Sequence, residues 1–183
     1  YILKKFKEKV TSMNNKPILV VAGEPNSIFL EIFFKSIIKN KFKKPIVLIV
    51  SKNLILEQMK KLNVRLNINL IDKKKLILQK LNNEKINIID VNYEFKKVFE
   101  KISDNSNEYI TKCFLLATQL LKSNKFSGLI NGPISKKNFL KDRYLGITEY
   151  LAKKTNRKNK AVMLIYNKKL SVSPITTHLP LKE

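Results

Sequence analysis

The sequence is poor in the side chains that most often build redox and metal sites. It has one cysteine, Cys113, and one histidine, His178, among 183 residues. A lone cysteine cannot form an internal disulfide, and in its apolar stretch it is most simply a buried small side chain. No run approaches the roughly 18 apolar residues that cross a bilayer, and charges are scattered through the N-terminus. We therefore expect a cytoplasmic protein with no membrane partner.

Arginine is scarce as well. Lysine and arginine together number 37 against 14 acidic residues, a formal net charge of +23, but only Arg65, Arg143 and Arg157 are arginines. Bidentate recognition of phosphate and guanine favours arginine. The lysines are also spread through every segment, which favours a solvated basic surface and predicts no nucleic-acid partner. A lysine-rich nucleic-acid-binding module is the alternative from another functional class, and lysines clustered on one face would support it.

Short apolar runs alternate with longer amphipathic segments, a pattern typical of buried parallel strands linked by helices. The predicted strands are Ile18–Ala22, Ile46–Val50, Leu66–Ile71, Ile86–Asp90, Gly128–Asn131 and Ala161–Tyr166. The predicted helices are Ser27–Asn40, Asn53–Leu62, Asn105–Ser123 and Ile147–Thr155. We interpret residues 72–85 and 92–103 as peripheral insertions. Residues 1–15 are interpreted as an N-terminal extension outside the domain.

Glycine is rare, with four in the chain, so each is expected where the backbone is constrained. Gly23-Glu24-Pro25 follows the first predicted strand and leads into a helix capped by Asn26 or Ser27. Ligands of open α/β sheets gather at the carboxyl ends of strands, where helix N-termini favour anions. This segment is therefore a candidate ligand-binding loop, and a plain strand-to-helix turn is the alternative.

Two further segments carry candidate chemistry. Asn131-Gly132-Pro133 again ends a strand, and Lys136 after it offers a cation for a phosphate or carboxylate, unless it simply faces solvent. His178 lies in a constrained run between two threonines and a proline. A lone histidine is more often structural than a metal ligand, because a metal site needs about three protein ligands.

Together these segments resemble a known family. Gly23–Pro25, Asn131–Pro133 with Lys136, Gly146–Glu149 and Thr176–Leu181 occur in the same order and at similar spacing as in 4-hydroxythreonine-4-phosphate dehydrogenases. The resemblance runs from about residue 16 to the end. It implies an α/β/α layered, mostly parallel sheet like that of isocitrate and isopropylmalate dehydrogenases, with part of the second lobe missing. Residues 16–183 would then be the N-terminal part of the enzyme.

The resemblance also implies an activity. Enzymes of this family are homodimers that use NAD or NADP and a divalent metal such as Zn, Mg or Co. They oxidise and decarboxylate 4-phosphohydroxy-L-threonine to 3-amino-2-oxopropyl phosphate, a step of pyridoxal 5'-phosphate (vitamin B6) biosynthesis. By this resemblance His178 is one of three metal-binding histidines and Thr148 contacts the substrate, a small phosphorylated hydroxy amino acid. Lys136 is the candidate catalytic charge near the substrate. No cofactor-binding residue is expected within the chain.

The sequence departs from the family pattern at two places. Ile147 stands where the family usually has a histidine in Gly-His-Thr-Glu, so a related dehydrogenase of another phosphorylated hydroxy acid or a dihydrodiol is the alternative. The helix start reads Asn26-Ser27-Ile28-Phe29 where the family usually has Ala-Gly-Ile-Gly. The chain also has no second histidine. We therefore expect that it lacks most of the active site and is inactive alone.

Overall fold

The computed structural model describes residues 16–73, 81–141, 143–157 and 161–175. The chain divides into two compact units, one within Tyr1–Ser135 and the other within Lys136–Glu183. None of the helices in the described ranges is long and apolar enough to cross a membrane.

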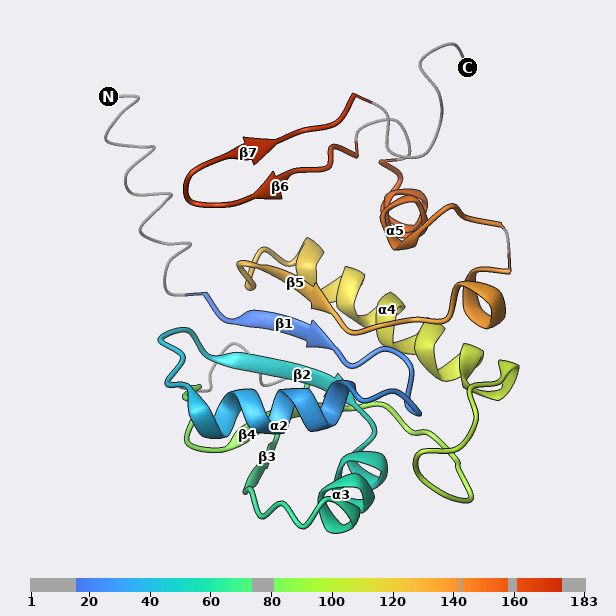
Figure 1. Cartoon of the computed structure of the whole chain (residues 1–183). Coiled ribbons are helices and arrows are strands. Elements are labelled where there is room, and N and C mark those ends of the chain that lie inside the picture. The colour runs from blue at the N-terminus through green and yellow to red at the C-terminus, as the bar shows by residue number, and fades with distance from the viewer. Residues whose placement is uncertain (1–15, 74–80, 142, 158–160, 176–183) are drawn as a thin grey trace. The chain divides into compact units, whose positions relative to one another are not determined.

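The first unit is built on one sheet of five parallel strands (Figure 1). The strands are β1 (Ile18–Val21), β2 (Ile46–Val50), β3 (Ile68–Leu70), β4 (Ile86–Asp90) and β5 (Gly128–Asn131), in the order β3-β4-β2-β1-β5. The inner strands are buried on both faces, which is why they read as unbroken apolar runs. The predicted parallel α/β sheet is thus confirmed, although β1 and β3 are shorter than expected.

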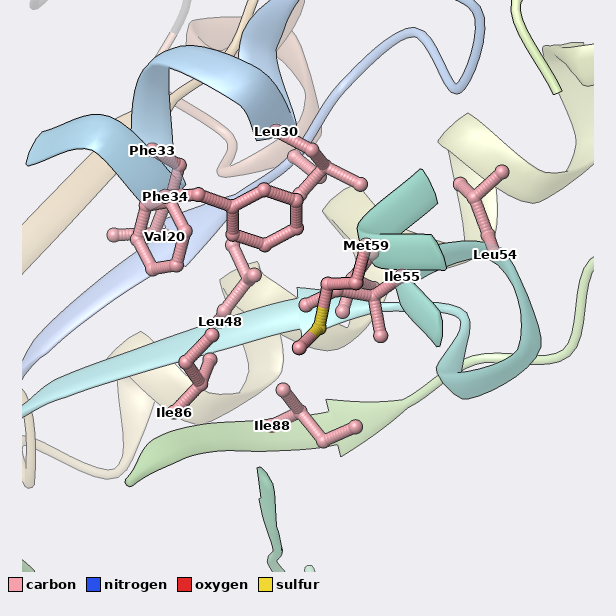
Figure 2. Packing of buried hydrophobic residues seen from close by; sticks show 12 residues of the cluster. Val20, Leu30, Phe33, Phe34, Leu48, Leu54, Ile55, Met59, Ile86 and Ile88 are labelled. Atoms are coloured by element: carbon pink, nitrogen blue, oxygen red, sulfur yellow. The ribbon is translucent and has the colours of Figure 1, made fainter. Parts of the chain in front are cut away.

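Helices α2 (Phe29–Lys39) and α3 (Lys52–Lys61) cover one face of this sheet. Alternate strand side chains point toward them, because successive residues of a strand face opposite sides. Figure 2 shows Phe34, which is fully buried, packed among these side chains. The buried cluster consists of Val20, Ala22, Leu30, Phe33, Phe34, Leu48, Val50, Leu54, Ile55, Met59, Ile86 and Ile88.

Helix α4 (Asn107–Lys122) lies on the opposite face, after a single 3-10 turn, η1 (Asp104–Ser106) (Figure 1). Its buried side includes Ile110, Cys113 and Phe114. Burial raises the pKa of the Cys113 thiol to about 12, so this side chain is an inert part of the core, as predicted. The helices on both faces give the three layers expected of an α/β/α fold.

The segment 92–103 has no regular helix or strand, but it is more than a peripheral insertion. Tyr93, Phe95 and Val98 are partly buried and pack against the core cluster. The rings of Tyr93 and Phe95 stack with centroids 5.8 Å apart. The sequence did not indicate that these three apolar side chains are part of the core, because charged and polar residues lie between them.

The second unit contains a single π-helical turn, η2 (Lys136–Leu140), helix α5 (Ile147–Lys154), and a hairpin of β6 (Ile165–Tyr166) and β7 (Ser171–Val172). Tyr150 is buried beside Phe139 and Tyr144, with ring centroids 5.2 and 5.3 Å away. Aromatic edge-to-face contacts of this kind stabilise small cores.

The predicted strand Ala161–Tyr166 is wrong in length and in partner. Only Ile165–Tyr166 is a strand, and it pairs antiparallel with β7 in a separate two-stranded sheet. The turn between them closes where Asn167 N–H donates to the carbonyl of Leu170 over 2.9 Å. The apolar side chains of this run are exposed, so its composition predicted a buried parallel strand that the hairpin does not form.

Candidate functional site at the carboxyl ends of β1 and β5

The turns that follow β1 and β5 touch through their backbones. Gly132 N–H donates to the carbonyl of Val21 over 2.7 Å, and Glu24 N–H donates to the carbonyl of Pro133 over 2.9 Å. Because β1 and β5 are parallel neighbours, their carboxyl ends lie at the same edge of the sheet. We expect three segments that follow strands, Gly23–Pro25, Asn131–Lys136 and Thr176–His178, to converge at one edge of the sheet. The structure brings Gly23–Pro25 and Asn131–Pro133 together there, whereas Thr176–His178 lies outside the described residues.

Glycine is required at both contacts. A Cβ on Gly132 would lie 2.1 Å from the carbonyl oxygen of Ala22, and one on Gly23 would lie 2.4 Å from that of Pro133. Gly23 also has a φ of +78°, a left-handed backbone conformation that residues other than glycine rarely adopt. The two rare glycines of these motifs thus allow the two turns to meet.

Glu24 is buried directly beneath this contact, with 3% of its surface exposed. One carboxylate oxygen accepts from the hydroxyl of Ser106 over 2.9 Å and the other from Asn26 N–H over 3.3 Å. Burial raises the pKa of Glu24 above its ordinary value of 4.5, while these two hydrogen bonds lower it. The carboxyl group therefore ties the end of β1 to the start of α4. No pattern in the sequence pointed to Ser106.

Asn26 and Ser27, the residues expected to cap α2, form hydrogen bonds in the loop that precedes the helix. The helix begins at Phe29 with Ile28 as its cap residue, so neither Asn26 nor Ser27 is the cap residue, although the Ser27 hydroxyl accepts from Phe29 N–H over 3.3 Å. Asn26 Oδ1 instead accepts from Glu100 N–H over 3.1 Å, and the Ser27 hydroxyl donates to the carbonyl of Glu24 over 2.7 Å. Both side chains thus hold the loop in place.

Gln58 is a buried residue of the site that sequence reasoning missed. It is fully buried, and its amide nitrogen donates to the carbonyl of Pro25 over 2.7 Å. Its amide oxygen has no hydrogen-bond partner among the residues the structure describes. The sequence did contain a signal for Gln58. It is a polar residue on the apolar face of an amphipathic helix, beside Leu54, Ile55 and Met59, and a buried polar side chain needs a hydrogen-bond partner.

The remaining predicted site residues lie in the second unit or outside the described ranges. Lys136 begins the π-helical turn η2. Ile147 and Thr148 open α5, as predicted, with Gly146 as the cap residue, and both side chains are half-buried. Beside them, Glu149 Oε2 is shielded from solvent and has no hydrogen-bond partner in the described part of the chain. His178 lies outside the described residues.

The described residues do not fit a divalent metal by themselves. Among them, no group of three or more His, Cys, Asp or Glu side chains is arranged to hold an ion. The one histidine, His178, supplies a single ligand where about three are usual. The buried carboxylate of Glu24 is already occupied by Ser106 and Asn26, so we derive no chemical step through a metal.

Comparison with known proteins places the chain in a family. The model of the family described as pyridoxal phosphate biosynthetic protein PdxA matches residues 41–183. The chain belongs to the PdxA family. Its resemblance to 4-hydroxythreonine-4-phosphate dehydrogenases is therefore confirmed at the level of the family.

Individual PdxA relatives carry two different substrate names. The chain is 32% identical to the 4-hydroxythreonine-4-phosphate dehydrogenase of Sulfurihydrogenibium sp. (strain YO3AOP1), covering 91% of this chain and 51% of the relative. It is 27% identical to the D-threonate 4-phosphate dehydrogenase of Pectobacterium atrosepticum, covering 92% of this chain and 53% of the relative. The chain spans about half the length of the curated relatives it matches.

A solved structure of a PdxA relative has the same fold. The 4-hydroxythreonine-4-phosphate dehydrogenase of Klebsiella pneumoniae superimposes with a TM-score of 0.78 at 25% sequence identity. The match covers 92% of this chain and 53% of that one. The expected dehydrogenase-like α/β architecture is confirmed by this match.

Replacing Gly132 with alanine should destabilise the first unit strongly, because the added Cβ would collide with a backbone oxygen that has little room to move. We expect a loss of about 2 kcal/mol or more in the free energy of unfolding, measured by urea titration. Gly128→Ala is the matched control, since a Cβ there meets no atom within 4 Å. Equal losses in the two variants would contradict the contact.

Replacing Glu24 with glutamine should change how stability depends on pH. The folded protein holds the Glu24 proton more tightly than the unfolded chain does, because the folded pKa is raised. As the pH rises from 4.5 through that raised pKa, the wild type should lose unfolding free energy that the variant keeps. Urea titrations across this range measure the difference. The exposed Glu84→Gln variant should follow the wild type, and a parallel course for Glu24→Gln would refute the assignment.

Proposed function

We propose that residues 16–183 form the N-terminal part of an NAD- or NADP-dependent 4-hydroxythreonine-4-phosphate dehydrogenase. The observation that carries this proposal is the match of residues 41–183 to the PdxA family, together with the meeting of the Gly-Glu-Pro and Asn-Gly-Pro turns. The reaction is the oxidation and decarboxylation of 4-phosphohydroxy-L-threonine to 3-amino-2-oxopropyl phosphate. The enzyme acts in the cytoplasm, in pyridoxal phosphate biosynthesis, as a homodimer.

Three residues of this chain have proposed roles. Thr148, in the first turn of α5, offers a hydroxyl to the substrate beside backbone N–H groups that favour an anion. Lys136 places a cation near the phosphate or carboxylate of the substrate. His178 contributes one ligand to a divalent metal, and the ligands that this chain lacks come from the other half of the enzyme. The cofactor also binds to that half.

A second candidate function is the oxidation of another phosphorylated hydroxy acid. Ile147 favours it, because an apolar side chain occupies the position where the family usually has a hydrogen-bonding histidine. A relative that acts on D-threonate 4-phosphate, by its name, lies at 27% identity. Ile147 is half-buried and offers no hydrogen bond. A substrate with fewer polar groups facing α5 would therefore have no polar group left unpaired against this side chain.

The 183-residue chain alone should bind divalent metal weakly and turn over no substrate, because one imidazole supplies one coordination position. The chain combined with a separately expressed C-terminal half should oxidise 4-phosphohydroxy-L-threonine, followed by the absorbance of reduced nicotinamide. His178→Ala should then remove both the activity and the tightly bound metal, which is measured independently by metal analysis. Robust turnover by the isolated chain, or full metal content in the variant, would show that the metal site is misplaced.

Ile147→His in that combined enzyme separates the two candidate substrates. If 4-phosphohydroxy-L-threonine is the natural substrate, the restored hydrogen bond to a charged group should raise kcat/KM about ten-fold or more. Ile147→Leu is the control, because it changes shape but adds no polar atom. A variant that loses activity toward D-threonate 4-phosphate and gains none toward 4-phosphohydroxy-L-threonine would favour the second candidate.

A further inference from the structure

The hairpin of the second unit exposes most of its apolar side chains. Seven large apolar side chains between residues 162 and 175 are 47% to 91% exposed. They are Val162, Leu164, Ile165, Tyr166, Leu170, Val172 and Ile175. Contiguous apolar surface on a soluble protein usually marks a place where another segment or a partner binds. We call residues 162–175 the apolar hairpin.

Both faces of the apolar hairpin carry these side chains. Successive residues of a strand point to opposite faces, so Tyr166 shares one face with Leu164, directly before β6, and Ile165 lies on the other. Val172 lies beside Ile165, because the two residues are directly opposite each other in the β6–β7 register. An antiparallel sheet with one face in solvent alternates apolar and polar residues. The apolar hairpin does not alternate in this way, which is typical of a sheet covered on both faces.

The strands also lack the charges that protect an exposed edge. Among the described residues β6 and β7 form a sheet of two strands, so each has one edge without a partner strand. Strands whose edges stay exposed usually carry lysine or another charge. In the apolar hairpin the only charged residues are Lys168 and Lys169, in the turn, although 28% of the whole chain is charged. The edges of both strands are therefore suited to pairing with further strands.

Hydrogen bonds within the hairpin define its shape. Asn167 Oδ1 accepts from Lys169 N–H over 3.0 Å in the turn, and the Ser173 hydroxyl donates to the carbonyl of Met163 over 2.8 Å at the open end. A hairpin of two strands is marginally stable in water by itself, and packing against further elements stabilises it. The apolar hairpin thus presents a defined surface that gains stability when it is covered.

The half of the enzyme that this chain does not contain is the occupant that fits. The chain matches the solved relative over 53% of that relative's length, so about half of the relative has no counterpart here. A segment of that length can supply strands for the edges and helices for both faces. A second copy of this chain fits less well, because a two-fold contact uses one patch of each copy and leaves the other face exposed.

We propose that the apolar hairpin is the surface on which the other half of the enzyme docks, pairing with the free edges of β6 and β7 and covering both faces. The inference rests on the proposed function, in which residues 16–183 are part of a longer dehydrogenase. His178 follows Ile175 by three positions, a span of at most about 11 Å. Docking at the hairpin therefore keeps the proposed metal ligand close to the half that supplies the other ligands.

Three lysine variants at equally exposed positions test this proposal. Leu164→Lys and Ile165→Lys lie on opposite faces of the hairpin, and Ile38→Lys on α2 is the matched control, since all three side chains are 61% exposed. The 183-residue chain is co-expressed with the C-terminal half, so that neither part has to fold alone. The affinity of the purified complex is then measured by sedimentation over a dilution series.

Leu164→Lys and Ile165→Lys should each weaken the complex at least ten-fold, because a charge replaces a large aliphatic side chain that docking buries. Ile38→Lys should leave the affinity unchanged. All three variants should keep the circular dichroism of the isolated wild-type chain, because the replaced side chains are exposed there.

The proposal is overturned if the wild-type halves form no complex, if Ile38→Lys weakens the complex as much as the hairpin variants do, or if only one hairpin variant weakens it. It is also overturned if the isolated chain forms a dimer that a hairpin variant dissolves while the complex of the two halves is unaffected, because a second copy is then the occupant. A complex that depends on both faces of the hairpin but does not oxidise 4-phosphohydroxy-L-threonine supports the docking surface and contradicts the proposed function.

Discussion

The carboxyl edge of the sheet depends on the contact between the backbones that follow β1 and β5. Strand β1 is hydrogen-bonded to β2 on one side and to β5 on the other, so its end is held from both directions. The contact with Pro133 then turns the chain at Gly23 and directs it into α2. The loop that starts α2, the burial of Glu24 and the position of Ser106 all follow from this one approach.

Polar groups buried at this edge are costly unless they are hydrogen-bonded. Glu24 meets that requirement through Ser106 and Asn26, and Gln58 meets half of it through Pro25. Groups of this kind hold a loop in one arrangement where apolar packing would allow several. A rigid loop at the carboxyl end of a strand is what a binding site needs, because catalytic and binding groups must be placed within fractions of an ångström.

The sequence predicted those parts of the fold that depend on local pattern. Unbroken apolar runs located the five parallel strands, and amphipathic spacing located the four long helices to within a few residues. It failed for residues 161–166, because exposed and buried apolar runs look alike until their partners are known. It also missed Ser106, 82 residues from Glu24 along the chain, since no local pattern encodes so distant a pairing. The positions of Gly23 and Gly132 could be predicted because glycine marks places where the backbone turns sharply or approaches another segment closely.

The position of β1 has a consequence for the order of folding. Its partner β5 is far away in the sequence. The hydroxyl of Ser127, just before β5, donates to the carbonyl of Pro17, just before β1, and these two residues are 110 positions apart. On a ribosome β1, β2 and β4 are complete long before β5 emerges, so one edge of β1 stays open during much of synthesis. An open edge of this kind can pair with another chain. Closing so long a loop is slow, and the addition of β5 is then the step that sets how long a nascent chain is exposed to aggregation.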